Sequence, residues 1–239
     1  MNRAAALEPL PGNPYTPQSG DVSIRVEHYD LTLKYRMQNN RLSGTATLSI
    51  RATVPLTAFS LDLVGLRVSK VAARGDKQAR FKQSDRKLKV TLSKPVEAGA
   101  AITLEVVYEG APRPRRSRWG TIGWEELEDG IIVASQPTGA PTWFPCNDHP
   151  ADKASYRIQV SVDSNYDVVA TGALHSRRSS GGLTTWVYEE AHRPPATSSP
   201  CRSAATGAKT CSSRESPDAC TTRPPSPVAW AQTSPTSPA

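Results

Sequence analysis

The sequence predicts an all-β protein, with an antiparallel sandwich or large curved sheet in residues 20–193. Apolar and polar residues alternate there in many short runs, which is the period of a half-buried strand. Turn-forming residues separate these runs. Over the same residues we find no sustained i, i+3, i+4, i+7 spacing of apolar residues, so no major helix is expected.

Residues 24–36 and 42–53 are predicted to form a hairpin. The alternation in the first run slips by one residue near His28, which indicates either a β-bulge or a break into two short strands. Between the two runs, Asn39 and Asn40 tolerate the positive φ of a tight turn.

The same alternation marks later strands along the chain. It recurs in residues 59–63, 88–92, 102–108, 156–162 and 186–188, with turns at Gly75, Gly99, Gly130, Gly181 and Gly182. Residues 131–134, Ile-Ile-Val-Ala, are continuously apolar instead, which predicts a strand buried on both faces.

Apolar residues become scarce near the end of the chain. Only 37% of the 239 residues are hydrophobic, and Val228 and Trp230 are the only large apolar side chains in residues 194–239. Such a segment cannot bury enough apolar surface to offset the entropy of ordering it, so a disordered tail is predicted. With residues 1–19 as a flexible N-terminal segment, residues 20–193 remain as one β domain.

The formal net charge of +7 makes a basic β module that binds nucleic acid a competing hypothesis. The densest basic stretches are residues 113–118 and 77–89. The first lies between prolines and a glycine, and we interpret it as a solvated loop with no aromatic set for base stacking. In the second, lysines alternate with apolar residues as on an exposed or edge strand. Nucleic acid is therefore not expected as a partner.

No feature of the sequence predicts a membrane-bound protein. No run approaches the roughly eighteen consecutive apolar residues of a membrane-spanning helix. The N-terminus has no apolar core of signal-peptide length before Glu8. A cytoplasmic location is therefore predicted.

The most specified segment is the loop 135–150, which holds Cys146, Asp148 and His149 beside two aromatic residues and four prolines. These three residue types can form a metal site or a Cys–His nucleophile. Close neighbours in an extended loop point in different directions, however, so structural roles are favoured. Cys146 is expected to be a small buried residue and Asp148 a turn former.

This segment resembles a known family. Residues 143–154, Trp-Phe-Pro-Cys-Asn-Asp-His-Pro-Ala-Asp-Lys-Ala, are similar to a signature in the N-terminal β domain of zinc aminopeptidases such as aminopeptidase N and leukotriene A hydrolase. That signature is Phe-Pro-Cys-x-Asp-x-Pro, followed by Lys-Ala and a strand. Residues 29–33, 44–48 and 170–172 resemble the family at the same places in order, so the resemblance covers residues 13–193.

The resemblance implies a saddle-like β sandwich that packs on a thermolysin-like catalytic domain, the expected partner. In the family, the loop after residues 131–134 reaches the active site, where a Gln or Glu holds the free α-amine of the peptide substrate. Gln136 stands at that place, and a neutral amide oxygen can accept a hydrogen bond from an ammonium group. Without the catalytic domain, Trp143 and Phe144 are expected to remain partly exposed as an apolar patch.

The zinc-binding motif of the family is missing from this chain. No two of its four histidines have the spacing of His-Glu-x-x-His, and neither Met1 nor Met37 belongs to a Gly-x-Met-Glu-Asn motif. The tail cysteines lack zinc-site spacing as well; they are Cys201, Cys211 and Cys220.

We therefore expect no catalytic residue, metal ligand or cofactor in this chain, and zinc only in the full-length family. The predicted function is that of the N-terminal domain of a zinc metalloaminopeptidase, inactive without the catalytic domain. A stand-alone basic β module that binds peptide, protein or nucleic acid is the alternative.

The composition of residues 194–239 is typical of a G+C-rich gene translated out of frame. The codon series TGC AGA TCG GCC GCT ACG is one that would encode residues 201–206, Cys-Arg-Ser-Ala-Ala-Thr. Read from the third base, they give Gln-Ile-Gly-Arg-Tyr, which resembles the strand that family members carry at this point. We infer a frameshift just after Arg193, with a genuine disordered tail as the alternative.

Translating the DNA downstream of codon 193 in the other two frames tests this inference. We expect a His-Glu-x-x-His motif there, because a frameshift leaves the catalytic domain encoded. Stop codons in all frames, with no such motif nearby, would favour the stand-alone module instead.

Overall fold

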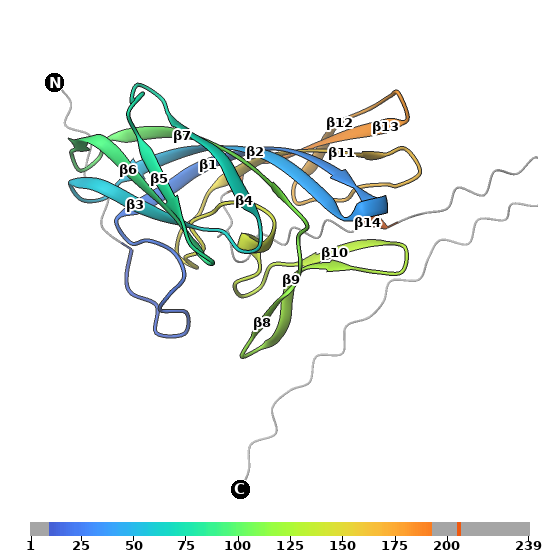
Figure 1. Cartoon of the computed structure of the whole chain (residues 1–239), viewed down its shortest axis with the longest axis horizontal. Coiled ribbons are helices and arrows are strands. Elements are labelled where there is room, and N and C mark those ends of the chain that lie inside the picture. Colours follow the sequence, from blue (N-terminus) through green and yellow to red (C-terminus); the bar gives the residue numbers. More distant parts are fainter. Residues whose placement is uncertain (1–9, 193–204, 207–239) are drawn as a thin grey trace, which may run out of the picture. The chain divides into compact units, whose positions relative to one another are not determined.

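A computed structural model describes residues 10–192 and 205–206, which fall within one compact unit, Met1–Lys209 (Figure 1). A second unit, Thr210–Ala239, lies outside the described residues. The helices described are two short 3-10 turns, η1 (Met37–Asn39) and η2 (Ala140–Thr142). Among the described residues, no helix has the length and apolar character needed to cross a membrane. The prediction of an all-β fold is confirmed.

A seven-stranded sheet is the largest element, in the order β12-β13-β11-β1-β2-β7-β4 (Figure 1). Its strands are β1 (Ile24–Arg36), β2 (Arg41–Ala52), β4 (Arg67–Ala73), β7 (Ala101–Gly110), β11 (Ser155–Asp163), β12 (Ala173–Ser180) and β13 (Leu183–Glu190). Neighbours pair antiparallel except β1 and β11, which are parallel. The fold is thus rich in antiparallel pairs, as predicted, with one parallel pair at its centre.

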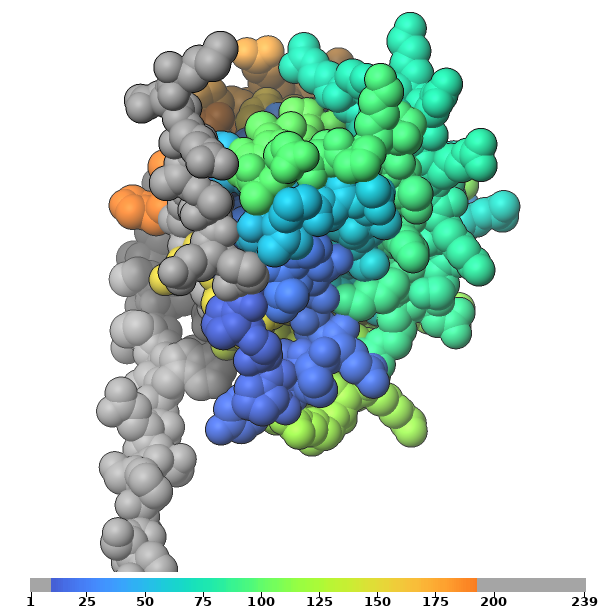
Figure 2. Space-filling model, turned by 90° about the vertical axis from the view of Figure 1, so that its left-hand side faces the viewer, coloured from blue at the N-terminus to red at the C-terminus, as the bar shows by residue number. Residues whose placement is uncertain are grey.

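Two smaller sheets complete the described unit. One has the order β3-β6-β5, from β3 (Leu56–Asp62), β5 (Arg80–Gln83) and β6 (Lys87–Val96). The other has the order β14-β10-β9-β8, from β8 (Arg115–Ser117), β9 (Gly120–Glu126), β10 (Gly130–Ala134) and β14 (Ala205–Thr206). Figure 2 shows the face where the segment before β1 (blue) lies beside β3 (pale blue) and the β5–β6 hairpin (green).

The first hairpin forms as predicted. The register of β1 against β2 shifts between Val26 and His28, so the phase slip is a bulge within one strand. Asn40 has φ 45°, which lets the chain turn back into β2. The bulge keeps Val26 and Tyr29 buried on either side of the slip.

The core is built from the inward faces of the alternating strands, and it is closely packed around Gly44. A Cβ added at Gly44 would lie 2.5 Å from Cζ of Tyr108, so the ring of this fully buried tyrosine occupies the space of the missing side chain. Glycine at this place in β2 therefore has a packing cause.

Two exposure predictions were wrong. Trp143 and Phe144 are each only 2% exposed. Their rings meet at 4.3 Å between centroids, and Phe144 contacts the Tyr29 ring edge-on at 5.4 Å, so the loop itself fills the core. Conversely, β10 is not buried on both faces, because Ile132 is 40% exposed on the outer face of its small sheet.

The predicted terminal segments, 1–19 and 194–239, lie mostly outside the described residues. Residues 10–19 are described, and in the tail Ala205–Thr206 forms β14, which pairs with Gly130 and Ile131 of β10.

Replacing Trp143 by Ala is expected to lower the free energy of unfolding by roughly 3–5 kcal/mol, because it empties a buried ring site. The matched control is Trp119→Ala at a 46% exposed ring, which is expected to change stability by less than about 1 kcal/mol. Urea denaturation followed by far-ultraviolet circular dichroism measures both. Equal and small losses of stability in the two variants would show that Trp143 is exposed, as the sequence first suggested.

Candidate functional site

The loop 135–154 connects β10 to β11, and it is buried to a degree that loops seldom reach. Every residue from 138 to 149 is buried. Buried backbone needs hydrogen-bond partners, and the loop finds them in β3 and in the segment that precedes β1. These contacts hold the loop in place against the sheets.

Asp62, at the end of β3, is the first anchor. Its backbone exchanges two hydrogen bonds with Cys146, at 2.7 and 3.0 Å. Its carboxylate accepts hydrogen bonds from the backbone N–H groups of Gly20 (2.8 Å) and Asp148 (3.2 Å) and pairs with the Lys87 ammonium at 2.8 Å. A single carboxylate therefore joins the loop, β6 and the N-terminal segment.

Asn147 is the second anchor, and its side chain is fully buried. Its amide oxygen accepts from the backbone N–H of Asp21 at 2.6 Å. Its amide nitrogen donates to Asp152 at 2.7 Å, and Asp152 also accepts from the N–H of Val26 at 3.0 Å. This chain of bonds supports the start of β1 at its bulge.

Cys146, Asp148 and His149 are all buried within the loop. Within the described ranges, no three His, Cys, Asp or Glu side chains cluster to hold a metal ion. Cys146 is fully buried, and burial raises the pKa of its thiol, which disfavours the reactive thiolate. The prediction that Cys146 is a small buried residue is confirmed.

His149 also has a structural role. One ring nitrogen, Nε2, lies 2.8 Å from the carbonyl of Pro11, and Nδ1 accepts from the backbone N–H of Ala151 at 3.2 Å. This pattern requires the neutral tautomer with hydrogen on Nε2. Burial lowers the pKa of His149, in agreement with a neutral ring.

Asp148 is not the turn former that the sequence suggested. Both of its carboxylate oxygens are buried without a hydrogen-bond partner, and the local turn is closed instead by the N–H of Asp152 on the carbonyl of His149. Burial raises the pKa of Asp148 well above its usual range, and the nearby Asp62 charge raises it further. The neutral, protonated form is thereby favoured.

Gln136 lies at the start of the loop, where it continues the outer face of β10 after Ile132 and Ala134, and it is exposed. Its side chain forms no hydrogen bond with any other described residue. The backbone around it is fixed, because the N–H of Gly139 donates to the carbonyl of Ser135 at 2.6 Å.

Close packing of η2 on β9 reinforces this turn. Thr142 accepts from the N–H of Trp124 at 3.0 Å and donates to the carbonyl of Gly139 at 2.7 Å. A Cβ on Gly123, which has φ 99°, would lie 2.4 Å from Oγ1 of Thr142, so only glycine fits there. Gln136 thus projects from a rigid support.

Comparison with protein-family models identifies the family of this chain. Residues 25–199 match the model of the Peptidase M1 N-terminal domain. The chain belongs to the M1 peptidase family. The match includes both anchors, the buried loop and Gln136.

Relatives of known structure in the M1 family share the fold. The M1 zinc metallopeptidase of Deinococcus radiodurans, in a variant bound to a Tyr-Ser-Ala substrate, superposes with a TM-score of 0.71 and 32% identity, over 76% of this chain and 42% of that one. Leucyl aminopeptidase of Saccharolobus solfataricus is 25% identical over 169 residues, 70% of this chain and 20% of that protein. Endoplasmic reticulum aminopeptidase 1 of Rattus norvegicus is 26% identical over 160 residues, 62% of this chain and 17% of that protein.

The chain therefore spans about a fifth of the length of these curated relatives. The residues described here are the M1 N-terminal β domain, and they include no catalytic domain. Because their His, Cys, Asp and Glu side chains do not fit a zinc site, no step of a zinc mechanism can be assigned to them.

Two structural residues, Asp62 and Lys87, were missed by the sequence analysis. Asp62 stands between Leu61 and Leu63, which are both fully buried. A charged residue between two core residues at a strand end was the available signal. Lys87 looked like one more lysine of an exposed or edge strand, but β6 is the central strand of its sheet and Lys87 pairs with Asp62.

The buried acids predict an unusual pH dependence. Burial raises the pKa of Asp152 to about 6 and that of Asp148 well above its usual range. An acid with a raised folded-state pKa binds more protons folded than unfolded, so stability is highest below its unfolded pKa and falls as pH rises through the folded value. Replacing Asp148 by Asn is expected to remove part of this loss of stability at higher pH.

We expect Asp148→Asn to be nearly neutral at pH 4.5 and to gain stability relative to the parent as the pH rises toward 7, because the variant has no carboxylate to ionise in the buried site. Asp85→Asn, at an exposed carboxylate, is the control and should follow the parent curve. Urea unfolding across this pH range measures the difference. Parallel curves for Asp148→Asn and the parent would contradict the raised pKa.

Proposed function

We propose that this chain supplies the N-terminal β domain of a zinc aminopeptidase and that Gln136 binds the free α-amine of the peptide substrate. The proposal rests on the side-chain amide of Gln136, which is exposed, forms no hydrogen bond with another described residue and lies on a rigid turn. An amide oxygen accepts from an ammonium group without needing a charge of its own. A fixed support reduces the entropy lost when the substrate binds.

The proposed partner is the zinc-bearing catalytic domain. Gln136 extends the outer face of the β9–β10 hairpin, where Ile132 and Leu127 are 40% and 51% exposed. Apolar side chains beside a substrate-binding amide suit a surface that packs against another domain. This placement would bring Gln136 to the edge of the zinc site, and the catalytic chemistry would belong wholly to the partner.

Peptides are the proposed substrate class, since two of the relatives named above are aminopeptidases and the M1 zinc metallopeptidase was solved with a Tyr-Ser-Ala substrate. The family match over residues 25–199 supports this proposal over a stand-alone binding module. The cytoplasm is the proposed location.

The test uses the gene restored to frame after codon 193, so that the β domain and the catalytic domain are made together. Gln136→Ala is expected to lower kcat/KM for aminoacyl-anilides by about 10- to 100-fold, because a hydrogen bond to a charged group contributes about 1.5–3 kcal/mol. Gln136→Glu should retain activity, since a carboxylate also accepts from the ammonium.

Gln78→Ala, at an exposed glutamine on the β4–β5 connection, is the matched control and should leave kcat/KM unchanged. The 239-residue chain alone provides the baseline and is expected to hydrolyse no anilide. An unchanged kcat/KM in Gln136→Ala would remove Gln136 from substrate binding, whereas hydrolysis by the chain alone would overturn the assignment of chemistry to the partner.

A further inference from the structure

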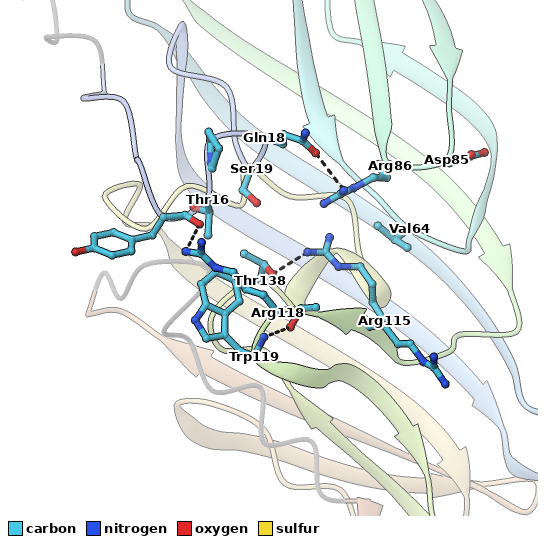
Figure 3. A pocket seen from close by; sticks show the side chains of 14 residues that line it. Thr16, Gln18, Ser19, Val64, Asp85, Arg86, Arg115, Arg118, Trp119 and Thr138 are labelled. Atoms are coloured by element: carbon cyan, nitrogen blue, oxygen red, sulfur yellow. Dashed lines mark hydrogen bonds between the residues drawn. The ribbon is translucent and has the colours of Figure 1, made fainter.

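A pocket of about 540 Å³ opens between the N-terminal segment and the β8–β9 hairpin (Figure 3). Residues 15–19 form one wall and residues 115–119 another, and Arg86 and Thr138 complete the lining used here. The stretch 113–118, expected to be a solvated loop, in fact contains β8, which aims Arg115 into this pocket.

Two guanidinium groups, those of Arg86 and Arg115, face the pocket without an acidic partner. Arg86 donates to the amide oxygen of Gln18 at 3.2 Å, and Arg115 donates to the buried hydroxyl of Thr138 at 2.9 Å. Among the described residues, neither arginine forms an ion pair. Asp85 also lines the pocket, but Figure 3 shows its carboxylate directed away from both guanidinium groups.

The charge of Arg115 is poorly compensated. Its pKa is lowered first by burial and then by the positive charge of Arg86. The acids that act on it from the interior are Asp148 and Asp62. Asp62 is already paired with Lys87, and burial drives Asp148 toward its neutral form. An anion between Arg86 and Arg115 would relieve their repulsion and form charge-assisted hydrogen bonds with both.

The other side of the pocket is aromatic and is held in place. Arg118 donates to the carbonyl of Tyr15 at 2.8 Å and lies over the Trp119 ring at 4.3 Å from its centroid. This contact ties the N-terminal segment to the β8–β9 hairpin across the mouth of the pocket (Figure 3). The ring of Trp119 is 46% exposed, which leaves an apolar surface for a ligand.

We propose that this pocket is an oxyanion-binding site, in which the carboxylate or phosphate group of a small ligand lies between Arg86 and Arg115 while its apolar body packs against Trp119. Guanidinium groups bind both oxyanions through paired N–H donors. The site uses neither Gln136 nor the outer face of β10, so it does not depend on the proposed peptidase function.

Isothermal titration of the 239-residue chain tests the site, with phenyl phosphate and phenylacetate as the two oxyanion probes and phenylacetamide as the neutral analogue. We expect one saturable site for at least one oxyanion, with no binding of the amide, and the tighter oxyanion identifies the ligand class. Rising NaCl concentration should weaken the affinity, because salt screens partly exposed charges.

Arg115→Gln and Arg86→Gln should each weaken binding by about tenfold or more. Arg178→Gln removes the same charge from an exposed position on β12 and should bind like the parent. Because Arg115 is half-buried whereas Arg86 is exposed, Arg86→Gln keeps the test valid if Arg115→Gln unfolds the chain; circular dichroism reports the fold of each.

Trp119→Ala should reduce the preference for phenyl phosphate over inorganic phosphate, which lacks an apolar body. Equal affinity in Arg86→Gln and Arg178→Gln would overturn the proposal, as would equal binding of phenylacetamide or the absence of saturable binding by either oxyanion. Failure of this site would leave the Gln136 experiment unaffected, since the two use different residues and different ligands.

Discussion

The structure depends on the bonds that the Asp62 carboxylate makes at the end of β3. This carboxylate is bound by the Lys87 ammonium and by the backbone N–H groups of Gly20 and Asp148. If it were removed, buried N–H groups and a half-buried lysine would lose their acceptor, which costs more than an ordinary surface contact. The loop 135–154 keeps its position because this interaction and the Asn147 amide hold its far end, while the packed turn at Gly139 holds its near end.

A satisfied carboxylate and an unsatisfied one lie beside each other in this region. The Asp62 carboxylate accepts the nearby hydrogen bonds, whereas the Asp148 side chain is buried with no hydrogen-bond partner. The fold tolerates this because a neutral carboxyl is far less costly to bury than a charged one. The same imbalance affects the neighbouring pocket, where Arg115 lacks the full negative charge that an ionised Asp148 would supply. The charge state of Asp148 therefore affects the pKa of Arg115 as well as the buried loop.

Much of the fold could be predicted from the sequence, because a half-buried strand alternates apolar residues on its buried face with polar residues on its exposed face. The hairpin, the bulge near His28 and most later strands followed from that rule. Contacts between distant segments could not be predicted. The burial of Trp143 depends on which ring it meets in the closed core, and the exposure of Ile132 depends on β10 lying in a small sheet. Gln136 was located by resemblance, whereas the arginine pocket needs residues 15–19 and 115–119 brought together.

The parallel pairing of β1 with β11 has a consequence for biosynthesis. β1 joins β2 at once through a short turn, but its other edge pairs with residues 155–161, which leave the ribosome much later. Until then the central strand of the largest sheet presents a row of unpaired N–H and C=O groups to solvent. Long-range pairing of this kind is slow and exposes nascent chains to aggregation. The nascent domain thus has a period of vulnerability during translation that ends only when β11 emerges, and chaperones that shield strand edges would be needed most in that interval.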